Sequence, residues 1–182
     1  MVSLQGQNVK LRAIEPEDLE CIFAWENDTE IWLVSNTLSP FSRFTIKKYI
    51  ENSHLDIFQA GQLRLMIEGL SLKNKHNYLT IGTIDIFDFD ANNQRAGIGI
   101  LIGNKDYRGK GYASEAINIL ISYSFSTLNL HQLYCNIAEN NKNSLSLFEK
   151  HGFQITGKKK EWIRTPKGWM DEYTLQLLKN SK

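Results

Sequence analysis

Residues 104–125 read NKDYRGKGYASEAINILISYSF and hold the most informative feature of this chain. Arg-Gly-Lys-Gly at 108–111 stands directly before a run of apolar side chains at helical spacing. The first turn of a helix has backbone amides without partners and carries the positive end of the helix dipole. Since glycines let an anion approach those amides, the stretch predicts a phosphate- or pyrophosphate-binding loop. The alternative is a tight strand-to-helix turn with its basic side chains in solvent.

Two common phosphate motifs do not fit this loop. A P-loop reads GxxxxGK[ST], but Gly103 lies one residue too far from Gly109, and Gly111 replaces the magnesium-binding hydroxyl. A dinucleotide fingerprint reads GxGxxG, but Ser114 stands in place of its third glycine. We therefore expect an anion loop that binds neither a nucleoside triphosphate nor NAD.

Length and charge set the class of protein. The chain has 182 residues, 42% of them hydrophobic, which suits one domain over 1–182 with its own core. With 21 basic and 20 acidic residues, its net charge of +1 speaks against a nucleic-acid binder. No apolar segment approaches the ~20 residues of a membrane span. Cys21 and Cys135 show no metal-binding or redox spacing, which predicts free thiols, no metal and a cytoplasmic location.

Hydrophobic periodicity predicts the order of the elements. Helices are expected to begin at residue 15 and at Tyr112 and to cover 45–60 and 141–150. A turn is expected over 88–94. The expected strands are 9–14, 63–67, 79–87, 95–103, 133–137 and two more within 153–178. Most strands follow one another directly, and one strand–helix–strand crossover lies in the second half. This pattern predicts a mixed α/β domain.

The loop and its surroundings resemble one known family. Arg108-x-x-Gly111-x-Ala113, after an aliphatic strand and opening a helix, is similar to the motif of the GNAT family of acetyl-CoA-dependent N-acetyltransferases. VKLRAIEPEDLECIFAWEND, NNQRAGIGILIG and AENNKNSLSLFEKHGF resemble the branch with ribosomal-protein N-terminal and polyamine acetyltransferases. The resemblance spans nearly the whole chain. It implies a mostly antiparallel sheet of about seven strands with four helices, whose fourth and fifth strands splay apart to form the CoA site.

The same resemblance implies residues that bind acetyl-CoA. Backbone amides around the pyrophosphate would come from Arg108, Gly109, Lys110, Gly111, Tyr112, Ala113 and Ser114. A β-bulge near Ile100, Leu101 and Ile102 would pair with the pantetheine arm, and the amide of Leu101 or Ile102 would face the thioester oxygen. Asn141 would lie on the far side of the pantetheine, although an N-cap for helix 141–150 is an equal alternative.

Two departures from the family leave the proton chemistry open. Phe148 stands where many members carry a tyrosine as general acid, so Ser144 is the first substitute and Ser146 a weaker one; Ser144 can equally be an ordinary helix residue. Gly97 stands where some members carry a glutamate that serves as base. Asp85 and Glu68 are the alternative bases, and an exposed site can also draw on the neutral fraction of the amine.

The acceptor is the least determined part of the resemblance. Direct transfer to a primary amine is expected, because no nucleophile motif indicates a covalent intermediate. Ser144 and Phe148 favour a protein or peptide N-terminal amine, a polyamine or other small amine is the main alternative, and a non-catalytic acyl-CoA sensor is another. The partners implied are acetyl-CoA, the amine and a second copy in a homodimer. Aromatic side chains expected to line an acceptor groove are Tyr134, Trp162, Trp169 and Tyr173.

Overall fold

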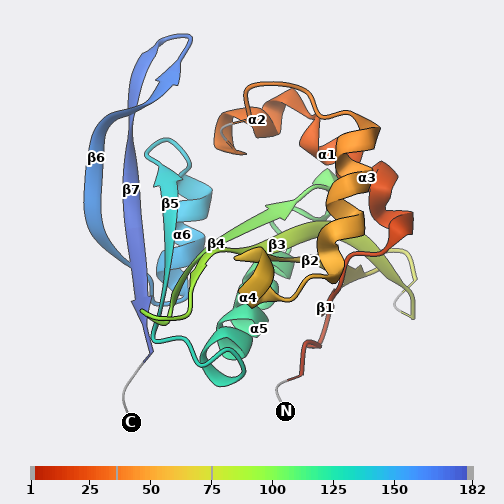
Figure 1. Ribbon diagram of the computed structural model, residues 1–182. Coiled ribbons are helices and arrows are strands. Elements are labelled where there is room, and N and C mark those ends of the chain that lie inside the picture. The colour runs from red at the N-terminus through yellow and green to blue at the C-terminus, as the bar shows by residue number, and fades with distance from the viewer. Residues whose placement is uncertain (1–2, 36, 75, 180–182) are drawn as a thin grey trace.

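A computed structural model describes residues 3–35, 37–74 and 76–179 and shows one seven-stranded sheet in the order β1-β2-β3-β4-β5-β7-β6 (Figure 1). Its strands are β1 (Val9–Arg12), β2 (Leu63–Leu70), β3 (Tyr78–Asp90), β4 (Arg95–Ile102), β5 (Gln132–Ala138), β6 (Gln154–Thr165) and β7 (Gly168–Leu178). The helices are α1 (Leu19–Glu26), α2 (Thr29–Ser35), α3 (Arg43–Glu51), α4 (Ile57–Ala60), α5 (Tyr112–Ser126) and α6 (Lys142–Lys150). Every neighbouring pair is antiparallel except β4–β5. The mixed, mostly antiparallel fold predicted from the sequence is confirmed.

Two local predictions were wrong, and one helix was missed. The helix expected over 45–60 is interrupted after Glu51, because Asp56 caps a separate helix, α4, by accepting from the amides of Phe58 and Gln59. Helix α2 was not predicted. Strand β3 continues to Asp90, so the turn expected from residue 88 is shorter. None of the helices in the described ranges is long and apolar enough to cross a membrane.

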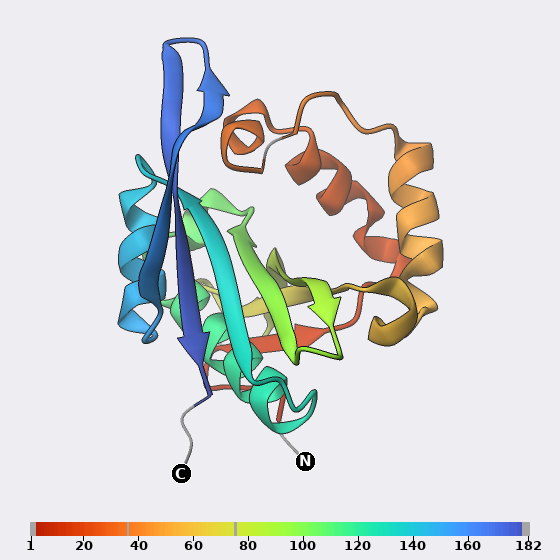
Figure 2. The ribbon, with the colours of Figure 1, turned by 60° about the vertical axis from the view of Figure 1, so that its left-hand side comes forward.

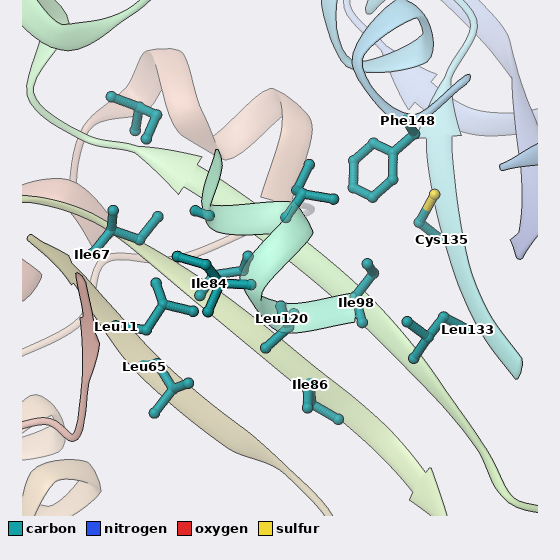
Figure 3. Packing of buried hydrophobic residues seen from close by; sticks show 14 of the residues in the cluster. Leu11, Leu65, Ile67, Ile84, Ile86, Ile98, Leu120, Leu133, Cys135 and Phe148 are labelled. Atoms are coloured by element: carbon teal, nitrogen blue, oxygen red, sulfur yellow. The ribbon is translucent and has the colours of Figure 1, made fainter. Parts of the chain in front are cut away.

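The sheet is covered on both faces, as alternation along β2 shows. Leu65 and Ile67 point to the face packed by α5 and its Leu120, whereas Met66 points to the face packed by Ile22 of α1 and by α3. Figure 2 shows α5 and the α1–α3 group on opposite sides of the sheet, and Figure 3 shows the packing of the larger cluster. The two helical layers hold β1–β4 as a rigid platform beside the fifth strand.

Strands β4 and β5 separate soon after they meet. Their parallel pairing covers only residues 95–97 of β4 against 132–134 of β5. Beyond Gly97, β4 pairs with β3 alone, in an unbroken register from Phe87↔Gly97 to Gly82↔Ile102. The expected splay is therefore confirmed. The bulge expected at 100–102 is not present; the open edge of β4 results from the splay, and the irregularity of this ladder lies between Phe87 and Asp90.

Candidate active site

The splay opens a cleft of about 520 Å³ between β4 and β5. One wall is the edge of β4 from Ile98 to Leu101, and the other is β5 from Cys135 to Ala138 with the first turns of α6. Charged residues of α1, β2, β3, β6 and β7 surround one part of the cleft: Glu26, Arg64, Asp85, Lys159 and Glu172.

The N-terminus of α5 is built without a capping side chain. Gly111 is the N-cap with φ of 90°, and Gly109 has φ of 71°, so both have a left-handed backbone that favours glycine. The amide of Glu115 is the first to bond within the helix, to the carbonyl of Gly111. The amides of residues 112–114 are therefore free for an anion. Arg108 and Lys110 pair with no acidic side chain in the described part of the chain; they bond the carbonyls of Ile102 and Asp106, at 2.8 Å and 2.7 Å.

Side chains of the loop anchor this helix start. The Tyr112 hydroxyl donates to the carbonyl of Leu70 on β2 at 2.9 Å. The Ser114 hydroxyl lies 2.9 Å from Nε2 of His151, at the end of α6, and Nδ1 of His151 lies 2.8 Å from Asn118. The open amides are thereby held against both the sheet and α6.

Along the edge of β4, the backbone N–H and C=O groups of alternate residues point away from β3. The carbonyl of Gln94 accepts from the amide of Gln132, and that of Ile102 accepts from Arg108, so these backbone groups point away from β3. Because backbone groups alternate along a strand, Ile98 and Ile100 share that direction. The carbonyl of Leu101 lies against Gly82 of β3, where a Cβ would collide with it. Of the two amides named from the sequence, that of Ile102 shares this direction and that of Leu101 does not, but Ile102 does not line the cleft; Ile100 has both the direction and a place in the lining.

Helix α6 brings Asn141, Ser144 and Phe148 to the cleft. Asn141 is its N-cap, with Oδ1 accepting from the amide of Ser144 at 3.1 Å, which confirms the capping role. The backbone N–H of Asn141 donates to the carbonyl of Ala138 at 2.9 Å, but neither its side-chain Nδ2 nor the Ser144 hydroxyl has a hydrogen-bond partner among the described residues, so both remain available to a ligand. Ser146 is exposed and does not line the cleft.

Phe148 and Cys135 form an apolar floor, side by side in Figure 3. Phe148 is buried with its ring edge-on to Phe153. Both cysteines are free, as predicted, and burial raises the pKa of the Cys135 thiol to about 12. Since the thiolate is the nucleophile, Cys135 stays an inert thiol near neutral pH, in agreement with direct transfer.

Asp85 takes part in a charged cluster centred on Arg64. Arg64 bonds Asp85 through Nε at 2.6 Å and Nη2 at 3.2 Å, and Glu26 through Nη1 at 2.6 Å. Burial raises the pKa of Asp85 above its usual range, and Arg64 opposes that shift. Glu68, the other base named from the sequence, bonds Arg12 at 2.8 Å and does not line the cleft. Of the two, Asp85 lines the cleft and Glu68 does not.

Comparison with known proteins identifies the family. The Acetyltransferase (GNAT) domain matches residues 8–154. The chain belongs to the GNAT acetyltransferase family. This GNAT protein is an acyltransferase, an N-acetyltransferase that uses acetyl-CoA, and the alternative of a non-catalytic sensor is set aside.

Its relatives include enzymes named for a polyamine. The chain is 30% identical to an uncharacterised N-acetyltransferase, p20, of Bacillus licheniformis, covering 98% of this chain and 97% of that one. It is 30% identical to the spermidine N(1)-acetyltransferase of Vibrio cholerae, over 84% of this chain and 82% of that one. A crystal structure of spermidine N-acetyltransferase from V. cholerae with CoA and spermine superposes with a TM-score of 0.82 at 25% identity, covering 95% and 96% of the two chains.

The glycine at 97 has a packing reason in this GNAT enzyme. A Cβ on Gly97 would collide with the ring of Phe87, which lies edge-on to Tyr134 across the β3–β5 surface. A glutamate at this position would have to displace that ring. The Phe87 ring, which itself lines the cleft, fills the space that a side chain at position 97 would need.

Only one of the four aromatic residues expected around the acceptor lines the cleft, namely Trp162. Tyr134 donates to Asp88 at 2.9 Å and faces a separate hollow. Tyr173 lies under the ammonium of Lys158, and Trp169 is exposed near the hairpin turn. Glu26, Arg64, Lys159 and Glu172 were not anticipated from the sequence. Of these four, only Arg64 could have been noticed in the sequence, because it is a charged residue inside the apolar run LRLMI.

Proposed function

We propose that this enzyme acetylates a primary amine of a polyamine in the cleft between β4 and β5, as one acetyltransferase domain over 1–182. The charge of the cleft carries the proposal: the carboxylates of Glu26, Asp85 and Glu172 line it against the cations of Arg64 and Lys159. Three carboxylates against two cations leave one formal negative charge in excess, which suits a cationic amine acceptor. Relatives named as spermidine N-acetyltransferases support the same class.

The residues present fit acetyl-CoA. The open amides at the start of α5 and the side chains of Arg108 and Lys110 would hold the pyrophosphate. The unpaired edge of β4 from Ile98 to Ile102 would accept the pantetheine arm as an added strand. The side-chain nitrogen Nδ2 of Asn141 would bond the arm from the opposite wall.

Each proton step has a candidate residue in the cleft. Bound acetyl-CoA supplies an activated thioester, whose carbonyl carbon the neutral amine attacks. The amide of Ile100 or Ile102 would stabilise the negative charge that develops on the carbonyl oxygen. Ser144 has a free hydroxyl to protonate the departing sulfur, and Asp85, whose pKa burial raises, would take the proton of the amine.

A second candidate acceptor is the N-terminal amine of a protein or peptide. The pair Ser144 and Phe148 favours it, because the ribosomal-protein branch is similar at these positions. The cleft would then take an extended chain end in place of a flexible polyamine.

Acetyl transfer to defined amines tests the proposal. The purified protein is given acetyl-CoA with spermidine, or with a peptide that has a free N-terminus, and the products are identified by mass. We expect acetylspermidine as the main product; acetylation of the peptide alone would refute the polyamine assignment. In parallel, acetyl-CoA at ~100 times its Kd should add about 2.7 kcal/mol of stability. That should raise the melting temperature by roughly 5–10 °C for this chain length.

A further inference from the structure

An ammonium group of the chain itself lies in the cleft. Nζ of Lys159 is 2.9 Å from Glu172 Oε2 and 3.2 Å from Asn136 Oδ1, and it lies 4.9 Å from the centre of the Trp162 ring. All four side chains line the cleft. A carboxylate, an amide oxygen and an indole face are together the groups that bind an amine cation.

Glu172 is the fixed part of this arrangement. Its side chain is 7% exposed, whereas that of Lys159 is 35% exposed. A nearly buried carboxylate needs a cation, and Lys159 supplies one from the neighbouring strand. Asn136 is held in place by Thr174, whose hydroxyl donates to the same Oδ1 at 2.9 Å.

Lys159, in contrast, stands at an irregular point of its strand. The β6–β7 register shifts between Lys159 and Ile163, and Glu161 within that interval has φ of 49°. The side chain is long and partly in solvent. Its ammonium can therefore leave the three partners for water while Glu172 cannot.

We propose that Glu172, Asn136 and Trp162 form a second ammonium subsite of the acceptor cleft, and that Lys159 sets its strength by competing for it. This inference rests on the proposed function. One amine of a polyamine is acetylated near Asp85, and a second ammonium binds between Glu172 and Trp162 when Lys159 moves out. The residue at 159 thus determines how strongly the cleft prefers a polyamine over a monoamine.

Lys158 offers a matched control. Its ammonium is bound by Asp171 at 2.7 Å and Glu139 at 3.4 Å and lies 5.2 Å from the centre of the Tyr173 ring. The chemistry is the same, but Lys158 and its partners lie outside the cleft. A general effect of removing a paired lysine from β6 should therefore appear equally at both positions.

The test is direct binding of spermidine and of propylamine, measured by calorimetry with the whole protein carrying Lys159→Ala or Lys158→Ala. Without the competing ammonium, Lys159→Ala should bind spermidine about tenfold more tightly, the value of one ionic hydrogen bond. Propylamine should gain less than spermidine, because a single ammonium cannot occupy both positions at once, and both ligands with Lys158→Ala should match the wild type. Adding Glu172→Gln to Lys159→Ala should remove the gain.

Equal changes for spermidine and propylamine, or no change for spermidine, would overturn the inference. If Lys159→Ala does not fold, Lys159→Gln keeps a neutral donor to Glu172 and should still tighten spermidine selectively. Because binding is measured without turnover, the result is separate from the proposed function. An enzyme that acetylates no polyamine would disprove the function, while the calorimetry would still decide the subsite.

Discussion

Replacing Ser144 with alanine should slow acetyl transfer without weakening the fold. The hydroxyl bonds no described residue, and the backbone amide that Asn141 caps is kept, so stability should stay within about 0.5 kcal/mol. General acids contribute about 10²–10⁴-fold, and a hydroxyl as weakly acidic as serine belongs at the lower end. We therefore expect kcat to fall about a hundredfold, or ~2.7 kcal/mol in the barrier, with KM for acetyl-CoA nearly unchanged.

The assay follows release of the CoA thiol at saturating acetyl-CoA and spermidine, with a melting curve for each variant. Ser146→Ala, on the exposed face of α6, is the matched control and should behave as the wild type. Phe148 lies one helical turn after Ser144 on the same face, so Ser144→Ala with Phe148→Tyr should recover part of the lost rate. A kcat for Ser144→Ala within twofold of the control would show that the hydroxyl is not the acid.

Other substitutions test the loop, the β4 packing and the His151 contact. Gly111→Ala should cost about 1–2 kcal/mol because φ is 90°, and should reduce the melting shift given by acetyl-CoA; an unchanged shift would contradict the pyrophosphate assignment. Gly97→Ala should destabilise by about 1–3 kcal/mol in urea unfolding because its Cβ meets the Phe87 ring, and a neutral result would contradict that contact. Burial, aided by Lys150, lowers the pKa of His151 below its ordinary 6.5, so the folded state binds this proton less readily than the unfolded state. Stability should therefore fall as pH drops from 6.5 toward the folded pKa, and His151→Gln should flatten that slope; equal slopes would refute the cause.

The strands and the loop could be predicted because their signals are local. Alternating residues mark the strands near 9–14 and 63–67, an apolar run marks 95–103, and the glycines at 109 and 111 mark a turn into a helix. The break in the helix expected over 45–60 was not predicted because Ile57 continues the apolar spacing. The hydrogen bonds by which Asp56 caps α4 form only in the folded chain. Helix α2, at seven residues, is too short for a clear period.

The charged half of the cleft depends on contacts that no local pattern contains. Arg64 and Glu26 lie 38 residues apart on different elements. The Lys159–Glu172 pair belongs to one hairpin, yet counting back from the turn pair Thr165↔Gly168 would place Thr174 opposite Lys159. The shift between Lys159 and Ile163 brings Glu172 there. A strand irregularity that the sequence does not mark thus decides which residue meets the lysine.

The short β4–β5 ladder divides the enzyme into two lobes that follow each other in the sequence. Residues 9–102 form the first lobe and residues 132–178 form the second, and α5 connects β4 of the first to β5 of the second. Three backbone pairs, the hydrogen bond from Tyr134 to Asp88 and one shared hydrophobic core join the two lobes. Asp85 belongs to one lobe and Ser144 to the other, so the distance between the two proposed proton-transfer groups depends on how the lobes are joined. Because one core runs through both lobes, we expect turnover and the sheet to be lost together on warming.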